Sequence, residues 1–332
     1  MRVLVVTSMY PTAQLPHYGV FIAEQVRSLR SAGIDVDVEF VNPRRTRLNY
    51  ALGVRPVLEQ LRRKPYDVIH THHSYTVPLV SAARALARSR APIVLTNHEG
   101  EALDQTPRRR PWRIVDGARS SRALKRWMAA RADFVIFVSR QLSEALATNG
   151  RHQIIPCGVD TTRFAPSDRL SCRRQLGLPS DGTVLFFPAS PRARGKRFEL
   201  VEAAFARLRG RVPGPVLVTG GGIPYETMPV YYNAADVVLQ SSFYEASPTI
   251  VKEALACEIP LVSTDSGDTR EVIEGVPFCF VCRDDPDEVA ARVMTCLGHR
   301  ATGGRARLML KGLSLEQVTD TLIQLYRTVG RS

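Results

Sequence analysis

The chain has 332 residues, 44% of them hydrophobic and 23% charged, with a mean hydropathy of −0.11 and a net charge of +13. That is the composition of ordinary globular domains. This composition excludes collagen-like, low-complexity and wholly disordered chains. The length, at roughly 150 residues a domain, predicts two domains. The charge is uneven, because residues 1–150 hold 23 basic against 12 acidic side chains and the remainder 22 against 20; we therefore expect anionic partners for the first half.

The beginning of the chain predicts a cytoplasmic protein. MRVLVVTSMY carries one basic residue and then a short strand-like run, which is too short for the apolar region of a signal peptide. No apolar stretch approaches the roughly 18–20 residues that cross a membrane. In such a chain the six scattered cysteines are expected to be buried thiols, and the single CxxC of Cys279 and Cys282 lacks the second pair of a zinc site.

The first half alternates short apolar runs with helical patterns. Apolar residues at 21, 22, 26 and 29, closed by Gly33, predict a helix over 19–33. Further helices are expected over 77–90, 116–131 and 140–149. Strands are expected over 1–6, 36–41, 66–72, 92–98, 132–139 and 153–160. This alternation predicts a parallel sheet with helices on both faces.

The second half repeats the scheme after a stretch rich in turn residues, which we interpret as a linker near 160–182. Strands are expected over 183–190, 216–221, 235–242, 260–265 and 278–282. Helices are expected over 197–209, 228–235, 248–257, 268–273, 286–298 and 314–329. The fold class predicted is α/β, with two doubly wound Rossmann-like domains over 1–162 and 163–312 and a last helix over 313–332.

Ligands of doubly wound sheets bind outside the carboxyl ends of the strands, so two such domains predict a cleft between them. The glycine patterns argue against two common occupants. The first loop offers only Gly19 before its helix, and Gly220–Gly222 has neither the GxGxxG spacing nor the Walker lysine. A dehydrogenase and a P-loop NTPase are therefore disfavoured.

The most informative segment lies between residues 240 and 271. Ser247 followed by Pro248 predicts an N-cap with proline at the first helical position. The free N–H groups of Thr249, Ile250 and Val251, together with the helix dipole, would then bind a phosphate or diphosphate.

Two carboxylates flank this helix start, Glu245 on the loop before it and Glu253 one turn inside it. Carboxylates beside a phosphate site could accept hydrogen bonds from ligand hydroxyls, which describes a nucleotide-sugar. The alternative is a capped structural helix with two surface glutamates.

The segment EASPTIVKEALAC from Glu245 to Cys257 resembles the donor-site motif of retaining GT-B glycosyltransferases of family four. The likeness continues in order along the chain, over residues 10–29, 131–139, 154–166, 231–242 and 260–273. The resemblance implies two Rossmann-like domains, a last helix that crosses back to the first domain, and no metal or other cofactor. It assigns the acceptor to the first domain and the donor to the second.

The resemblance also implies roles for single residues. Glu245 matches the glutamate that contacts the donor sugar, and Glu253 the one that contacts the ribose, while the backbone after Ser247 would hold the diphosphate. Gly19 matches the glycine that lets the first loop approach the donor phosphate. His98 matches the histidine near the reacting sugar, although the loop here reads His98-Glu99-Gly100-Glu101 rather than the usual His-Gly-x-acid.

Lys196 matches the lysine that neutralises the departing diphosphate, and a departing phosphate needs a fixed cation or a metal. The family's arginine five or six residues earlier is missing, because Ser190 and Pro191 occupy those positions. Arg192 and Arg194 are the candidates to replace it. The segment 222–228 is shorter than in the family and leaves the nucleotide base open. We interpret His70, His72 and His73 as acceptor-side or structural groups and see no metal site.

A basic segment over 107–131 carries nine Lys or Arg side chains, one Asp and both tryptophans of the protein. Basic residues with interfacial aromatics suit an anionic membrane surface, and the alternative is a solvated basic helix. The expected membrane or acceptor surface comprises Arg108, Arg109, Arg110, Trp112, Arg113, Arg122, Lys125, Arg126 and Trp127. No zinc, RRM, KH or helix-turn-helix signature supports nucleic-acid binding.

The sequence thus predicts a metal-independent, retaining glycosyltransferase, with His98, Lys196 and Glu245 as catalytic groups. Its partners would be a nucleotide-sugar donor, a glycan, lipid-linked or small-molecule acceptor, and an anionic membrane surface at the inner face. Two rivals remain. One is a nucleotide-sugar epimerase of the same architecture, which would need a further acid/base pair. The other is a scaffold that binds nucleotide-sugars or membranes without catalysis.

Overall fold

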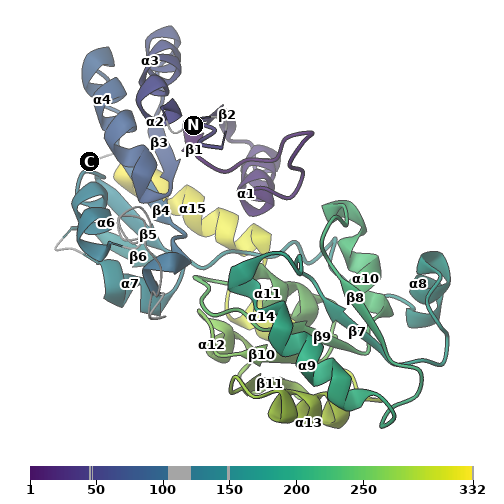
Figure 1. The fold of residues 1–332 in the computed structure, drawn as a ribbon. Coiled ribbons are helices and arrows are strands. Elements are labelled where there is room, and N and C mark those ends of the chain that lie inside the picture. Colours follow the sequence, from purple (N-terminus) through teal and green to yellow (C-terminus); the bar gives the residue numbers. More distant parts are fainter. Residues whose placement is uncertain (45, 47, 104–120, 148–149, 331–332) are drawn as a thin grey trace. The chain divides into compact units, whose positions relative to one another are not determined.

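A computed structural model covers the chain (Figure 1), and it describes every residue except 45, 47, 104–120, 148–149 and 331–332, together with the side chain of Arg194. The chain divides into two compact units. Unit 1 consists of Met1–Cys157 and Glu316–Ser332, and unit 2 of Gly158–Leu315. The sequence placed these boundaries after residues 162 and 312.

Unit 1 is built on a six-stranded parallel sheet in the order β2-β1-β3-β4-β5-β6. Its strands are β1 Arg2–Thr7, β2 Asp35–Phe40, β3 Val68–His72, β4 Ile93–Asn97, β5 Phe134–Phe137 and β6 His152–Ile154. Because successive side chains point to opposite faces, Val3 and Val5 pack against one set of helices and Leu4 and Val6 against the other. The first set is α1 Val20–Ser31 and α15 Leu315–Val329, and the second is α3 Val54–Arg63 and α4 Val77–Ala87.

Unit 2 repeats the plan with a five-stranded parallel sheet in the order β11-β10-β9-β7-β8. Its strands are β7 Val184–Phe187, β8 Val216–Thr219, β9 Val237–Gln240, β10 Leu261–Thr264 and β11 Cys279–Cys282. One face is covered by α10 Met228–Ala234, α11 Thr249–Ala256, α12 Thr269–Ile273 and α14 Gly304–Leu310. The other is covered by α9 Phe198–Leu208 and α13 Pro286–Cys296.

Shorter elements complete the described residues. The remaining α-helices are α2 Asn49–Leu52, α6 Arg122–Ala129, α7 Arg140–Leu146 and α8 Arg169–Leu176. The 3-10 turns are η1 Ser74–Thr76, η2 Gly100–Leu103, η3 Arg194–Lys196 and η4 Tyr225–Thr227. None of the helices in the described part of the chain is both long and apolar enough to span a membrane.

The predicted α/β class with two doubly wound parallel sheets is confirmed, and the bounds of each expected strand lie within about three residues of those found, apart from 153–160, of which only the beginning is strand. The prediction of a linker over 160–182 is wrong, because α8 occupies much of that stretch. Arg173 on α8 is buried, and its guanidinium donates to the Asp236 carboxylate and to the carbonyl of Ala234. These bonds fix α8 to unit 2.

Candidate functional site

The start of α11 lies at the carboxyl edge of the unit 2 sheet, after β9. The prediction that Ser247 caps this helix is wrong. Pro248 occupies the cap position, and none of the described side chains caps the helix. The Ser247 hydroxyl donates instead to Asp268 Oδ2 at 2.7 Å and accepts a bond from the Lys252 ammonium. The first N–H groups of α11, from Thr249 to Val251, are therefore left to an external partner.

A buried ion pair holds this loop in place. Lys252 is fully buried, and its Nζ lies 3.1 Å from Asp268 Oδ2. The other carboxylate oxygen, Asp268 Oδ1, is buried without a hydrogen-bond partner among the described residues. The sequence reasoning missed this pair, since Lys252 sits at a helix position where a lysine usually faces water.

Lys196 and Glu245 meet although they are 49 residues apart. The Lys196 ammonium donates to Glu245 Oε1, and the Ser242 hydroxyl donates to the same oxygen at 2.8 Å. The two side chains keep 30% and 21% of their surface exposed, so both are reachable from solvent. Here the structure joins two groups that the sequence predicted as catalytic.

The loop that carries Lys196 is anchored by its neighbour. Arg197 has a positive φ of 48° and is buried, with its guanidinium on the Asp284 carboxylate and, at 2.7 Å, on the carbonyl of Ser241. On the other side, a Cβ on Gly267 would lie 2.8 Å from the carbonyl oxygen of Ala246. The backbone before α11 therefore packs tightly against the loop of Gly267. Arg192 is exposed, and the Arg194 side chain lies outside the described residues.

Glu253 is buried, with 4% of its surface exposed, so the reading of two surface glutamates is wrong for this residue. The Tyr232 hydroxyl donates to Glu253 Oε2 at 2.6 Å. Burial raises the pKa of Glu253 from its ordinary 4.5 to about 7, against the lowering effects of Tyr232, Thr249 and Lys196. Glu253 is therefore a buried, hydrogen-bonded carboxyl group within α11, eight residues after Glu245.

In unit 1 the carboxyl ends of β3 and β4 bring four histidines together. His98, directly after β4, has its Nε2 3.0 Å from His72 Nδ1, and the two rings stack. The other nitrogen of His98, Nδ1, lies 3.6 Å from the Cys157 sulfur. His73 Nδ1 lies 3.5 Å from the Ser8 hydroxyl.

His70 forms a second buried arrangement. Its Nδ1 meets the hydroxyl of Tyr326 on α15 at 2.6 Å, and its Nε2 meets Thr96 Oγ1 at 2.7 Å. Burial lowers the pKa of His70 to about 3 and lowers the pKa values of His72 and His98 well below 6.5. The imidazoles are therefore neutral, which suits hydrogen bonding rather than charge stabilisation.

The loop after His98 is braced by Glu99 and Lys125. Glu99 is buried and accepts bonds from Ser74 N, Ser74 Oγ and Asn97 Nδ2, between 2.8 and 2.9 Å. Lys125 Nζ lies 3.6 Å from Glu99 and 3.0 Å from Glu101. The prediction that Lys125 belongs to an exposed membrane surface is wrong, because the side chain is fully buried by this pairing.

The rest of the predicted basic surface divides between described and undescribed residues. Arg122, Arg126 and Trp127 on α6 are exposed, Trp127 with 53% of its surface. Arg108, Arg109, Arg110, Trp112 and Arg113 lie outside the described residues.

Gly19 is required by the backbone at the start of α1. Its φ is +76°, and a Cβ would lie 2.5 Å from the carbonyl carbon of Met9, a distance that no side chain tolerates. The glycine therefore lets the loop 9–18 fold back on the helix start.

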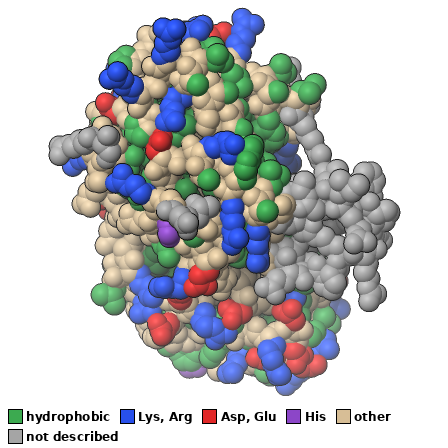
Figure 2. All heavy atoms as spheres, turned by 90° about the vertical axis from the view of Figure 1, so that its left-hand side faces the viewer, with side chains coloured by type: hydrophobic (Ala, Val, Ile, Leu, Met, Phe, Trp, Pro, Cys, Tyr) green, Lys and Arg blue, Asp and Glu red, His purple; other side chains and the backbone are tan. Residues whose placement is uncertain are grey.

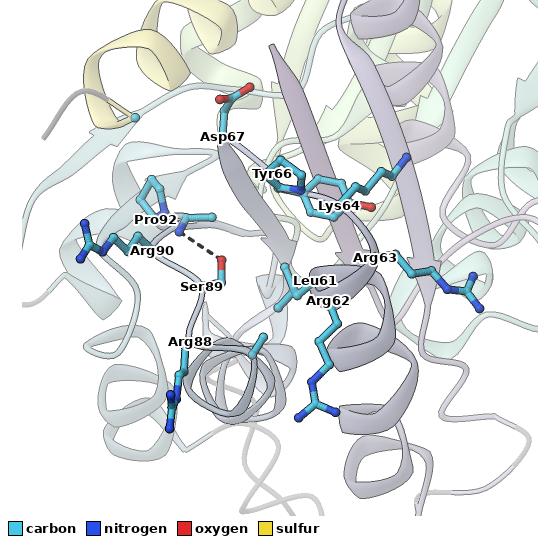
Figure 3. Close-up of a pocket in the computed structure, with 14 residues that line it drawn as sticks. Leu61, Arg62, Arg63, Lys64, Tyr66, Asp67, Arg88, Ser89, Arg90 and Pro92 are labelled. Carbon is cyan, nitrogen blue, oxygen red and sulfur yellow. Dashed lines mark hydrogen bonds between the residues drawn. The ribbon is translucent and has the colours of Figure 1, made fainter.

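A hollow of about 510 Å³ lies at the opposite, amino-terminal edge of the unit 1 sheet (Figure 3). It is lined by the last residues of α3 and α4 and by the loops that lead into β3 and β4. Arg62, Arg63, Arg88 and Arg90 are exposed at its rim. Figure 3 shows Arg62 and Arg88 extending in the same direction from neighbouring helix ends. Within the described residues, no three His, Cys, Asp or Glu side chains are arranged to hold a metal ion.

Comparison with known proteins gives two family matches that together span most of the chain. Residues 1–163 match the model described as Glycosyltransferase Family 4, and residues 185–299 match Glycosyl transferases group 1. A D-inositol 3-phosphate glycosyltransferase of Geodermatophilus obscurus is 27% identical over 318 residues, covering 81% of this chain and 68% of the relative.

Solved structures share the fold at lower identity. A sucrose-phosphate synthase of Thermosynechococcus elongatus has a TM-score of 0.80 at 18% identity and covers 99% of both chains. HepE of Anabaena, in complex with UDP-glucose, has a TM-score of 0.72 at 18% identity and covers 99% of this chain and 100% of its own.

Proposed function

Because the chain belongs to the family-four glycosyltransferases of GT-B architecture, we propose that it transfers a sugar from a nucleotide-diphosphate-sugar to an acceptor hydroxyl, with retention of anomeric configuration and without a metal. The observation that carries the proposal is the Lys196–Glu245 pair beside the uncapped start of α11. A fixed cation, a carboxylate and free helix N–H groups at one place match the diphosphate and the hydroxyls of such a donor.

Each group has a defined role in the proposal. The N–H groups from Thr249 to Val251 and the Lys196 ammonium bind the diphosphate, while Glu245 accepts hydrogen bonds from the sugar and Glu253 from the ribose. In the structure Lys196 is bonded to Glu245. A bound donor therefore places its negative phosphates beside Lys196 and its hydroxyls beside Glu245, and both groups gain partners.

The proposed reaction takes place on one face of the sugar. The bond between the anomeric carbon and the phosphate oxygen breaks, and the acceptor oxygen bonds to the same carbon. The acceptor proton moves to the departing phosphate oxygen, so no enzyme nucleophile is needed. Lys196 and the start of α11 stabilise the negative charge that grows on the diphosphate, and neutral His98 supports the reacting sugar from unit 1.

The neighbours suggest which substrates to test first. The complex of HepE with UDP-glucose favours UDP-sugars as the first donors. The name of the Geodermatophilus relative favours a phosphorylated polyol as one acceptor class, beside glycans and lipid-linked acceptors.

We also propose that the enzyme works in the cytoplasm and attaches to anionic membrane at the inner face. Figure 2 shows that most of the charged side chains in the upper part of the face that it draws are basic. Arg62, Arg63, Arg88 and Arg90 at the hollow supply this charge, with Trp127 on α6 as an interfacial aromatic.

The activity is tested with purified protein, a panel of nucleotide-sugars and mixed acceptors, and NMR of the product. We expect one donor class to turn over to an α product from an α donor, unchanged by EDTA. Glu245→Ala should abolish most of the turnover, while Glu202→Ala, at an exposed position within α9, should not. Donor binding without turnover would favour the scaffold, and an inverted sugar hydroxyl without transfer would favour the epimerase.

Membrane attachment has its own test. We expect the protein to co-sediment with phosphatidylglycerol vesicles at low salt, and the fourfold Gln variant of Arg62, Arg63, Arg88 and Arg90 to lose most of that binding. The matched control replaces four exposed arginines of unit 2: Arg209, Arg211, Arg270 and Arg283. Equal loss in both variants would show that net charge, rather than this surface, attracts the protein.

A further inference from the structure

The two nitrogens of His98 differ in the strength of their partners. Nε2 faces the imidazole nitrogen His72 Nδ1 at 3.0 Å, within good hydrogen-bond distance. Nδ1 faces the sulfur of Cys157 at 3.6 Å, and a thiol is both a weak acceptor and a weak donor. One nitrogen is therefore firmly held, and the other has a partner that a ligand oxygen could replace at little cost.

The hydrogen bond between the two histidines has two possible directions. In one, His72 Nδ1–H donates to His98 Nε2. In the other, His98 Nε2–H donates to His72 Nδ1, and the proton of His72 then sits on Nε2. His72 is fully buried, and its Nε2 has no hydrogen-bond partner among the described residues. The second direction would bury an N–H donor without an acceptor, and orphaned buried N–H groups are rarer than unfilled lone pairs.

The first direction fixes the proton on His98. With Nε2 accepting from His72, neutral His98 carries its hydrogen on Nδ1 and donates it to the Cys157 sulfur. We propose that His72 is a positioning residue that holds His98 as the Nδ1–H tautomer, so that His98 offers a hydrogen-bond donor to a ligand oxygen at the place where Cys157 Sγ lies. That the oxygen belongs to the transferred sugar or the acceptor rests on the proposed function.

Neighbouring groups support a fixed, neutral His98. The Phe21 ring lies 4.8 Å from the His98 ring, centre to centre, and the His72 ring stacks on it with an angle of 13° between the planes. Burial and the nearby His73 and His70 lower the pKa of His98 well below 6.5. The groups that face the pair are thus aromatic rings, imidazoles and a thiol, and Glu99 turns its carboxylate to Ser74 and Asn97 instead.

His70 is the natural contrast within the same cluster. Both of its nitrogens meet oxygen partners at 2.6 and 2.7 Å, Tyr326 and Thr96. Neither partner is weak, so His70 has no nitrogen ready for a ligand. The exchangeable position in the cluster is the Cys157 side of His98.

The first experiment reads the tautomer of His98 directly, from the nitrogen chemical shifts of protein with labelled histidine. We expect Nδ1 protonated and Nε2 unprotonated in the wild type. His72→Asn, whose amide can replace the Nδ1–H donor, should keep this tautomer. His72→Met removes the donor and puts an acceptor-only thioether beside Nε2, so it should move the proton toward Nε2. Tyr326→Phe, which cuts a buried hydrogen bond of His70, is the control and should leave His98 unchanged.

The second experiment follows turnover of the same variants. We expect His72→Met to lower kcat about tenfold, the equivalent of one hydrogen bond in the transition state, with KM for the donor changed less than about twofold. His72→Asn should recover most of the loss, and Tyr326→Phe should retain full kcat. A purely structural role for His72 would instead lower kcat and thermal stability together in all three variants.

Cys157 supplies an independent check if His72→Met does not fold. Cys157→Ser offers His98 Nδ1–H a stronger acceptor, so the ligand has to displace a better bond. We expect KM to rise several-fold at unchanged kcat, with the tautomer kept.

Two outcomes would overturn the proposal: a wild-type His98 protonated on Nε2, or a His98 tautomer that does not change when His72 is replaced by Met. Failure of all donors to react, with the Nδ1–H tautomer present, would instead count against the proposed function alone.

Discussion

The two units share an architecture but differ in the side chains that they carry at the carboxyl edge of the sheet. Each has a parallel sheet whose carboxyl edge carries a loop braced by a buried lysine, Lys125 with Glu99 in unit 1 and Lys252 with Asp268 in unit 2. Unit 1 presents neutral imidazoles there, and unit 2 presents an ammonium and carboxylates. One fold thus carries two kinds of chemistry, because the strand ends fix positions while the loops choose the side chains.

This difference in side chains indicates that the two units contribute different interactions to a bound ligand. Burial keeps the histidines of unit 1 uncharged, so they can orient hydroxyl groups without attracting a phosphate. The charged groups of unit 2 stay partly exposed, and an exposed cation can meet a diphosphate. Each unit is therefore specialised by desolvation as much as by residue type.

The largest expected effect concerns the two buried lysines. Lys252→Met should destabilise the protein by about 3–5 kcal/mol, because Asp268 would remain as a buried charge with one hydroxyl partner. Lys125→Met should cost less, since Glu99 retains three hydrogen bonds from Ser74 and Asn97. Urea unfolding of both variants measures the difference. An equal loss of unfolding free energy in the two variants would contradict this expectation. It would show that the hydrogen bonds of Glu99 do not compensate for the lost ammonium group.

The next effect concerns the exposed charge of unit 2. Lys196→Ala should lower kcat about 10²–10³-fold, the loss typical of one group that stabilises a developing anion. Lys311→Ala, at an exposed lysine of the same unit, is the control and should leave kcat unchanged. Steady-state kinetics with saturating donor decide the point, and an equal loss in both variants would remove Lys196 from the proposed mechanism.

The pH dependence of stability should have opposite signs in the two units. The pKa of Glu253 is about 7, above its ordinary 4.5, so its contribution to stability is present below pH 4.5 and lost as the pH rises toward 7, by about 3 kcal/mol. The pKa of His70 is lowered from 6.5 to about 3, so its contribution is present above pH 6.5 and lost as the pH falls toward 3.

Hydrogen exchange can separate the two units, with β3 and β4 amides reporting unit 1 and β9 and β10 amides unit 2. Between pH 4.5 and 6.5 we expect the protection free energy to rise with pH in unit 1 and to fall in unit 2. Glu253→Gln should remove most of the fall. Slopes of the same sign in both units would contradict the assignment.

The smallest effect compares two glycines of unit 2, Gly267 and Gly275, whose φ values are +58° and +79°. A Cβ on Gly267 would lie 2.8 Å from the carbonyl oxygen of Ala246 and 3.0 Å from that of Glu245, whereas a Cβ on Gly275 would meet no described atom within 4 Å. Gly275→Ala should lose about 1–2 kcal/mol to the left-handed conformation, and Gly267→Ala should lose more, because its Cβ would clash with backbone carbonyl groups. Gly267→Ala should in addition lower kcat, since it displaces the loop of Glu245. Thermal unfolding and kinetics of the pair separate strain from displacement.

Much of the architecture could be predicted because parallel strands are buried on both faces and appear as apolar runs. The helices that were missed had signals of their own. Apolar residues at 54, 57, 58 and 61 follow helical spacing in α3. Asp168 caps α8, and Gly177 ends it with a positive φ. The turn residues on either side of α8 favoured a linker there instead.

The candidate site was predictable only in part. Glu245, Glu253 and the start of α11 are close in sequence, so spacing alone places them together. Lys196 joins Glu245, and Cys157 joins His98, across 49 and 59 residues. Local patterns do not report such contacts, and neither do they report that Lys125, in a basic run, turns inward to Glu99 and Glu101.

The sequence by itself determined the strand–helix alternation, the two sheets and the residue types at their carboxyl edges, because periodicity and chain order control these. Only the tertiary structure decided the protonation of those residues and their partners. The Ser247 hydroxyl donates to Asp268 rather than capping α11, Tyr232 donates to Glu253, and His98 shares a hydrogen bond with His72. The physical reason is that burial and hydrogen-bond partners depend on packing between distant segments, and these set the charge that each group carries.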